Sequence, residues 1–445
     1  MAPAYSEIAA LLADLPPSID ADTIYAEWQA MSAFYDIEAR HLPLPVWARR
    51  PLEDDGPRAW EILQGELAYR NPDRAFCIYL HIPFCARRCG FCDCYSFKMG
   101  TGHEDHFRRY TDTLIKEMRL WSETGDLAQR RISTVHLGGG TPTFLPTADF
   151  RRLMRSCQTL FSVDQHTEWA LESTTAQLTD EMLPVLDELG FTRLHIGVQS
   201  LEDRVRTRIH RQEPADTVIE KIEKTVGRGW VVSVDMIAGL PGQSLAGLLD
   251  DLRLLADLSV DGFSLYEMQV SPRNRRFAQD QGLMAEPRLK KYVMIQAAAR
   301  LLEALGYRKT LFNHFARRRD MNLYFSFPER NEDCLAVGTI ADGVFGDYHY
   351  RHPSYAAYMR SATADYPGLQ GGLRRNASEN ILQPLTTALL AARIPEALLY
   401  TSVPPPLRAR WEHAQLLAHQ PDEQIFTLTS NGSWLLGNMI SERFA

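Results

Sequence analysis

Residues 79–94 have the sequence YLHIPFCARRCGFCDC, and this stretch sets the interpretation of the whole chain. Cys85, Cys89 and Cys92 have the spacing CxxxCxxC directly after a short β-rich run. Three thiolates from one loop can hold three irons of a [4Fe–4S] cluster, which usually has four cysteine ligands, so one iron stays open to a small molecule. The alternatives are a zinc site or buried structural cysteines. A zinc site usually adds a distant second CxxC pair, which this chain lacks.

The wider cysteine usage favours metal or redox chemistry over a disulfide framework. The chain has 7 cysteines, an odd number, and four of them lie between residues 85 and 94. A disulfide framework would spread its cysteines through a short secreted chain, whereas such crowding in a reducing compartment indicates metal or redox chemistry. We expect Cys77, Cys157 and Cys334 to be reduced and buried.

Length and composition indicate an acidic globular protein of two or three domains, or one large barrel with attachments. The 445 residues are 45% hydrophobic and 23% charged, and 48 Lys and Arg against 56 Asp and Glu give a net charge of −8. This balance argues against bulk nucleic-acid binding. The sequence contains no apolar run of membrane-spanning length and no secretory signal pattern. We expect a cytoplasmic monomer without nucleic-acid or membrane partners.

From Phe76 onward, short β-rich runs alternate with longer amphipathic segments, a pattern that predicts parallel βα architecture. We expect a partial (β/α)6 barrel, because eight such units would be needed to close one. The six predicted strands are Cys77–Ile82, Thr134–Leu137, Glu168–Glu172, Arg193–Val198, Val231–Ile237 and Gly262–Met268.

The remaining segments divide the chain into four predicted units. Residues 1–75 form an N-terminal extension, 76–308 the barrel, 309–378 a substrate-side connecting segment and 379–445 a mainly helical C-terminal domain. The closing residues predict a strand, a turn at Asn431-Gly432 and a helix, as in a small winged-helix-like unit, for which the acidic balance favours structural packing over DNA binding.

The cysteine stretch, together with GGGTPTFL at residues 138–145, resembles the radical S-adenosylmethionine (radical SAM) superfamily. Within it the chain is most similar to the HemN-like branch of oxygen-independent coproporphyrinogen III oxidase, over roughly residues 76–347. The resemblance implies an α/β barrel that holds a [4Fe–4S] cluster on Cys85, Cys89 and Cys92. It assigns no ligand role to Cys94. It also implies S-adenosylmethionine as cofactor and an external electron donor of the flavodoxin or ferredoxin type.

The resemblance further implies two adjacent S-adenosylmethionine sites. Taken singly, each matching residue is as compatible with a structural role as with a role in cofactor binding. Together they fall at the carboxyl ends of parallel strands, where barrel enzymes place their active sites. The implied cofactor contacts are Tyr79, Phe91, the glycine-turn residues Gly139, Gly140 and Thr141, and then Glu172, Gln199, Arg211, Asp235 and Gln269.

Two positions depart from the porphyrinogen oxidase: Gln269 replaces a small residue and Asp342 an aliphatic cofactor contact. The chain also lacks that enzyme's N-terminal arm motif.

The polar aromatic segment 347–352 is either a solvated loop or an acid/base wall. The candidates for a catalytic acid/base are Asp342, His314, Tyr348 and His349.

These departures favour the class C radical methyltransferases and cyclopropanases. In such enzymes one S-adenosylmethionine is cleaved to a 5′-deoxyadenosyl radical, and the second provides a methylene radical that adds to an sp² carbon. We therefore expect a methyltransferase or cyclopropanase for a small, aromatic or heteroaromatic natural product. The first alternative is a haem-pathway enzyme, either a coproporphyrinogen III decarboxylase or a haem-opening methyltransferase. The second is a non-catalytic haem chaperone, which Cys94 disfavours because chaperone relatives have Phe there.

Overall fold

The computed structural model describes residues 5–13, 19–36, 41–69, 74–100, 102–285, 288–361 and 365–444. Its centre is a curved sheet of 13 strands in the order β1-β15-β14-β13-β12-β2-β5-β6-β7-β8-β9-β11-β10. Within the described residues, no helix is long and apolar enough to cross a bilayer.

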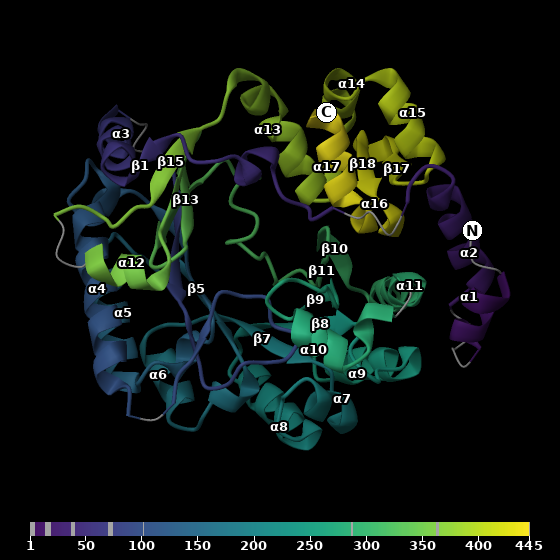
Figure 1. Cartoon of the computed structure of the whole chain (residues 1–445), viewed down its shortest axis with the longest axis horizontal. Coiled ribbons are helices and arrows are strands. Elements are labelled where there is room, and N and C mark those ends of the chain that lie inside the picture. Colours follow the sequence, from purple (N-terminus) through teal and green to yellow (C-terminus); the bar gives the residue numbers. More distant parts are fainter. Residues whose placement is uncertain are drawn as a thin grey trace.

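The middle of the sheet is parallel and confirms the predicted barrel architecture. Each predicted strand is present, and the inter-strand helices cover the outer side of the sheet (Figure 1). The parallel strands are β2 (Phe76–Ile82), β5 (Ile132–Gly139), β6 (Glu168–Ser173), β7 (Arg193–Gln199), β8 (Val231–Ala238), β9 (Gly262–Glu267) and β12 (Asp333–Val337).

The helices that follow these strands bury one amphipathic face against the sheet. In α4 (Glu104–Ser122), Phe107, Tyr110, Leu114 and Trp121 are buried at helical spacing. Each such side chain contributes roughly 1.5–3 kcal/mol by leaving water. The other barrel helices are α5 (Thr147–Leu160), α6 (Met182–Glu188), α7 (Asp203–Arg208), α8 (Ala215–Val226), α9 (Leu245–Asp257), α10 (Arg275–Asp280) and α11 (Arg288–Ala304).

Both edges of the parallel region continue as antiparallel strands. Part of the segment predicted to connect the barrel to the C-terminal domain therefore belongs to the barrel sheet, since β12 pairs in parallel with β2. One edge carries β13 (Asp342–Phe345), β14 (Tyr348–Arg351), β15 (Gly371–Arg374) and β1 (Asp54–Asp55), and the other carries β11 (His314–Ala316) and β10 (Arg308–Leu311). A short helix, α12 (Tyr355–Arg360), follows β14.

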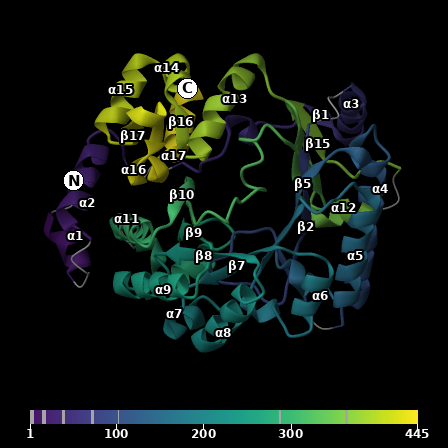
Figure 2. The same cartoon turned by 180° about the vertical axis from the view of Figure 1, so that it is seen from behind.

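The N-terminal residues pack in two places. Helices α1 (Tyr5–Leu12) and α2 (Ala21–Ser32) lie beside α11, where Trp28 packs edge-on against Tyr292 at 5.1 Å between ring centroids. Helix α3 (Gly56–Tyr69) lies at the opposite end of the sheet, beside β15 (Figures 1 and 2). Residues 41–55 run from the C-terminal domain, where His41 N donates to Asn438 Oδ1, to β15, where Asp54 pairs with Gly372.

The C-terminal domain combines helices with a three-stranded sheet in the order β16-β18-β17. The predicted turn at Asn431-Gly432 is wrong: both residues lie in α16, because the Thr429 side chain caps this helix by accepting a hydrogen bond from Gly432 N at 3.0 Å. The elements are α13 (Ala377–Leu390), β16 (Arg393–Pro395), α14 (Glu396–Ser402), α15 (Pro405–His413), β17 (Leu417–Gln420), β18 (Ile425–Leu428), α16 (Ser430–Trp434) and α17 (Leu436–Phe444).

Candidate active site

The cysteine loop follows β2 and lies at the carboxyl ends of the parallel strands. Cys85 ends the two-residue strand β3 (Phe84–Cys85), which pairs with β4 (Phe97–Lys98), and Cys89 and Cys92 are joined by a turn hydrogen bond of 3.2 Å. All three thiols line one cavity of about 370 Å³, here called the cysteine cavity. The structure therefore brings the three predicted ligands to one space.

The three thiols suit a cluster better than a single ion. Among the described residues, no three Cys, His or carboxylate groups are arranged to hold one metal ion. A [4Fe–4S] cluster takes one thiolate per iron and does not need such convergence. The Cys94 thiol hydrogen-bonds Cys92 and lowers the pKa of Cys92, which favours its thiolate form. Buried Cys77, Cys157 and Cys334 lie elsewhere as free thiols.

The glycine turn is bonded directly to the cysteine loop. Gly140 N donates to Ile82 O at 2.8 Å, and Thr141 N donates to Phe84 O at 2.8 Å. A Cβ on Gly140 would lie 2.6 Å from Phe84 O, so glycine is required here by the protein's own packing. Gly139 has a φ of +111°, a conformation that side chains disfavour. Gly139, Gly140 and Thr141 all line the cysteine cavity, so the structure brings these three predicted cofactor contacts together.

Glu172 stands opposite this turn at the end of β6. Its carboxylate accepts a hydrogen bond from Gly139 N at 3.3 Å and lies 3.3 Å from His136 Nε2. Burial alone raises the pKa of Glu172, but His136 and Gly139 N together hold it below its usual value. Glu172 therefore presents an ionised carboxylate to the cavity.

Gln199 and Arg211 leave polar atoms unsatisfied in the cysteine cavity. Gln199 Oε1 and Arg211 Nε are buried without a hydrogen-bond partner among the described residues, and both side chains line the cavity. Gln199 also has a φ of +72°. The Arg211 guanidinium lies 5.8 Å from the centre of the Phe91 ring. Because buried polar groups are normally bonded, these atoms fit a polar, charged ligand such as an amino-acid head group.

A second cavity of about 570 Å³, here called the apolar cavity, adjoins the first. The two share Phe91, Cys92, Cys94, Glu172, Gln199 and Asp235, so a ligand in one would meet a ligand in the other. Gln269, predicted as a cofactor contact, lines only the apolar cavity. The walls of the apolar cavity also include residues of the C-terminal domain and residues 42–43.

Tyr79 is placed differently from the other predicted cofactor contacts. Its ring stacks on Tyr324 at 5.1 Å, and its hydroxyl lies 3.0 Å from His81 Nδ1. It lines neither cavity. Phe91 and Asp235, by contrast, line both.

The candidate acids and bases are also separated from the two cavities. Asp342 pairs with Arg351 at 2.9 Å, and His349 lies 2.8 Å from Arg375 Nη1. Both line a third cavity of about 330 Å³ that reaches α13. Tyr348 donates to Asp54 at 2.8 Å instead, because neighbouring residues of a strand point to opposite faces.

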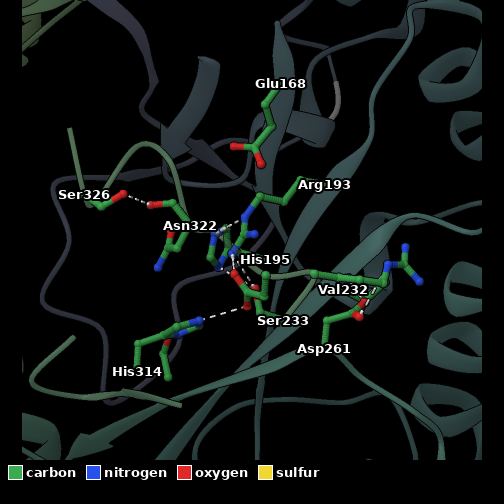
Figure 3. A network of polar contacts seen from close by, with 12 residues as sticks. Glu168, Arg193, His195, Val232, Ser233, Asp261, His314, Asn322 and Ser326 are labelled. Atoms are coloured by element: carbon green, nitrogen blue, oxygen red, sulfur yellow. Dashed lines mark hydrogen bonds and ion pairs between the residues drawn. The ribbon is translucent and has the colours of Figure 1, made fainter. Parts of the chain in front are cut away.

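His314 is buried inside the barrel wall rather than facing a cavity. It belongs to a polar network with Arg193, His195 and Ser233, shown in Figure 3. Sequence reasoning missed this network; its one sequence signal is the alternation of polar residues along Arg193–Gln199 and Val231–Ala238. Lys309 in the apolar cavity was also missed, since an isolated lysine carries no spacing signal.

A parallel barrel with a CxxxCxxC loop against a glycine turn defines an iron–sulfur enzyme built to bind a small charged cofactor beside its cluster. Residues 79–255 match the family model of the Radical SAM superfamily. Residues 79–255 therefore form a radical SAM domain, and the chain has HemN-like homologues. That family implies a [4Fe–4S] cluster and S-adenosylmethionine.

The chain is 27% identical to anaerobilin synthase of Escherichia coli O157:H7, with 82% of each chain covered. It is 30% identical to oxygen-independent coproporphyrinogen III oxidase of Helicobacter pylori. That alignment covers 64% of this chain and 65% of the relative's length. The solved structure of coproporphyrinogen III oxidase (HemN) from Escherichia coli aligns with a TM-score of 0.77 at 21% identity, over 93% of this chain and 98% of that one. This last likeness shows the shared fold.

Proposed function

We propose that this radical SAM enzyme acts on a porphyrin-type tetrapyrrole, and that it alkylates the macrocycle with two molecules of S-adenosylmethionine. The named relatives support a haem-pathway substrate over the natural product expected from the sequence. The proposal keeps the methyl-transfer chemistry expected from the sequence and adopts the alternative of a haem-opening methyltransferase.

The observation that carries this proposal is the lining of the apolar cavity. Six aromatic side chains line it together with several aliphatic ones, and its volume is about 570 Å³. Lys309 is the only basic side chain among the described residues that line it, while Asp93, Glu172, Asp235 and Glu267 are acidic. A flat apolar ring with few carboxylates suits such walls. Haem carries two propionates and coproporphyrinogen III carries four, so the lining favours haem.

The residues of the cysteine cavity have defined tasks in this proposal. When bound, the reduced cluster and S-adenosylmethionine supply a 5′-deoxyadenosyl radical, with an external flavodoxin- or ferredoxin-type protein as electron donor. Cys85, Cys89 and Cys92 hold the cluster. Glu172 accepts hydrogen bonds from the cofactor, and Arg211 donates to its carboxylate.

The shared wall positions two ligands next to each other. Gln199 and Asp235 face both cavities, so they can contact a second S-adenosylmethionine and the macrocycle at once. The C-terminal residues Ser433 and Trp434 line the apolar cavity, where they would limit the access of water to the reacting carbon.

The test uses anaerobically reconstituted protein with dithionite, S-adenosylmethionine and either haem or coproporphyrinogen III. We expect 5′-deoxyadenosine and S-adenosylhomocysteine to form in step with loss of the haem Soret band. Carbon dioxide release from coproporphyrinogen III without S-adenosylhomocysteine would show an oxidative decarboxylase instead. Tight haem binding without 5′-deoxyadenosine would indicate the chaperone. Turnover of neither tetrapyrrole, with no haem binding, would overturn the proposed substrate class.

A further inference from the structure

Three neighbouring strands bring an acid, an alcohol and an imidazole into one row. Asp235 on β8 is the register partner of Ser264 on β9, and Ser264 is the register partner of His314 on β11. Because facing residues in adjacent strands present their side chains to the same side of the sheet, the three groups form a line from the cavity wall into the barrel.

Hydrogen bonds connect this row to a buried carboxylate. Ser264 Oγ lies 2.9 Å from His314 Nδ1, and His314 Nε2 lies 2.9 Å from Asp320 Oδ2. At the other end, Asp235 faces Ser264 across the β8–β9 pair, on the same side of the sheet. The row therefore links a group on the cavity wall, through one hydroxyl, to a buried His–Asp pair (His314 in Figure 3).

The far end of the row is held in an ionised state. Arg193 Nη2 lies 2.6 Å from Asp320 Oδ1. Burial alone raises the pKa of Asp320, but Arg193 and His314 hold it well below its usual value. His314 Nε2 therefore carries a hydrogen that it donates to the Asp320 carboxylate, which leaves Nδ1 to accept a proton from Ser264.

Strand β9 leaves room for the His314–Asp320 pair at Gly262. A Cβ on Gly262 would lie 2.1 Å from Asp320 Oδ2 and 2.9 Å from His314 Nε2. Glycine at this position lets both side chains lie against β9, and any larger residue would push them away from Ser264.

The near end of the row faces both ligand spaces. Asp235 lines the cysteine cavity and the apolar cavity. Burial, and then the nearby Glu172 carboxylate, raise the pKa of Asp235 to about 7, against the opposing effect of Arg211. Tyr266 is the remaining titratable group beside it. Asp235 can thus gain or lose a proton near neutral pH, as an acid/base catalyst requires.

We propose that Asp235 is the acid/base group facing the substrate, and that it exchanges its proton with His314 through Ser264. This inference deepens the proposed function and rests on it, because alkylation of an sp² carbon ends with loss of a proton. Asp235 is the catalytic residue, whereas Ser264, His314 and Asp320 are positioning residues that act through it.

The proton step balances within the row. The Asp235 carboxylate takes a proton from the ligand, and the electron pair of the broken bond stays on the ligand. Asp235 then gives a proton to Ser264 Oγ as Ser264 gives its hydroxyl proton to His314 Nδ1. The result is an Asp235 carboxylate, an intact Ser264 and a His314 imidazolium paired with Asp320.

The first experiment follows the His314 ring by NMR in protein with the cluster oxidised, with no substrate present. The chain has 13 histidines, and the signal that disappears in His314→Gln identifies His314. We expect the ring-nitrogen chemical shifts of His314 to change in Asp235→Asn and in Ser264→Ala, because both substitutions alter the surroundings of the hydroxyl that bonds Nδ1. Ser264→Thr keeps the hydroxyl and should restore the wild-type chemical shifts.

A matched control is available on the neighbouring strand. Ser233 Oγ lies 2.9 Å from His195 Nδ1, the same distance as in the Ser264–His314 pair. Ser233→Ala removes an equivalent buried hydroxyl outside the row and should leave the ring-nitrogen chemical shifts of His314 unchanged. A His314 signal that responds to neither Asp235→Asn nor Ser264→Ala would overturn the relay.

The second experiment measures product formed per 5′-deoxyadenosine. Ser264→Ala should still cleave S-adenosylmethionine but form about tenfold less product per cleavage, because general acid–base catalysis contributes about 100-fold or more. The pH dependence of this ratio should also shift, and Ser264→Thr should recover it. A wild-type ratio in Ser264→Ala, despite changed His314 chemical shifts, would refute the catalytic role. Failure of the tetrapyrrole substrate leaves the NMR result readable and is therefore distinguishable.

Discussion

Lys309 provides the sharpest test of the substrate class. Its side chain lines the apolar cavity, where Nζ donates to Ser433 Oγ at 3.0 Å and lies 5.7 Å from the centre of the Phe315 ring. A propionate that enters this cavity would receive a charge-assisted hydrogen bond from the ammonium. Such a bond is worth about 1.5–3 kcal/mol, or about a 10- to 100-fold change in affinity. Lys309→Met keeps a long apolar side chain and removes the charge.

The pH dependence gives an independent reading of the same contact. Burial lowers the pKa of Lys309 to about 8. The ammonium is therefore present below pH 8 and is lost as the pH rises through that value. Haem affinity of the unmodified protein should be highest below pH 8 and should fall between pH 8 and pH 9. In Lys309→Met the affinity should be low and flat across this range.

The assay is an anaerobic haem titration followed by absorbance, at pH 7 and pH 9. Lys224→Met is the matched control, because Lys224 lies half exposed on α8 and pairs only with surface carboxylates, including Glu220 at 2.9 Å. Its haem affinity should equal that of the unmodified protein. An affinity of Lys309→Met within twofold of the unmodified protein at pH 7 would refute the reasoning, as would a pH-independent affinity before mutation.

Three further outcomes are expected. Replacing any of the three predicted cluster ligands by Ala should abolish the brown iron–sulfur absorbance after reconstitution, while Cys94→Ala should keep it; intact absorbance in all three ligand variants would contradict the assignment. Gly139→Ala places a Cβ 2.6 Å from the His81 ring at a φ of +111°, so S-adenosylmethionine affinity by equilibrium dialysis should fall at least about tenfold. Glu117→Ala unpairs buried His352 and should cost about 3–5 kcal/mol in urea unfolding. Burial alone raises the pKa of Glu117, but His352 holds it below 4.5, so its stabilisation is present above pH 4.5 and is lost as the pH falls further.

Much of the barrel could be predicted because its strands and helices carry their own periodicity. The predicted strands, β2 and β5 to β9, are local patterns, and each is largely buried in its own right. Strand β12 was missed because it follows an irregular segment, and its pairing partner β2 lies more than 250 residues earlier in the chain. The prediction of a turn at Asn431-Gly432 is wrong because the Thr429 side chain caps a helix that contains both residues.

The acid/base group shows the same limit at the site. His314 was a candidate from the sequence, yet its role depends on facing Ser264 across two strands. Tyr348 and His349 were grouped as neighbours in sequence, but strand alternation sends them to opposite faces.

The sequence by itself determined that this protein presents three cysteines from one loop beside a glycine turn, because spacing within a loop is a local property of the chain. It also determined the parallel barrel, since hydrophobic periodicity is local too. Only the tertiary structure decided which groups meet: the register of β8, β9 and β11 aligns Asp235, Ser264 and His314, and the C-terminal domain contributes part of the wall of the apolar cavity. These contacts join residues far apart in the chain, and their energies depend on burial and distance, which no single segment of sequence contains.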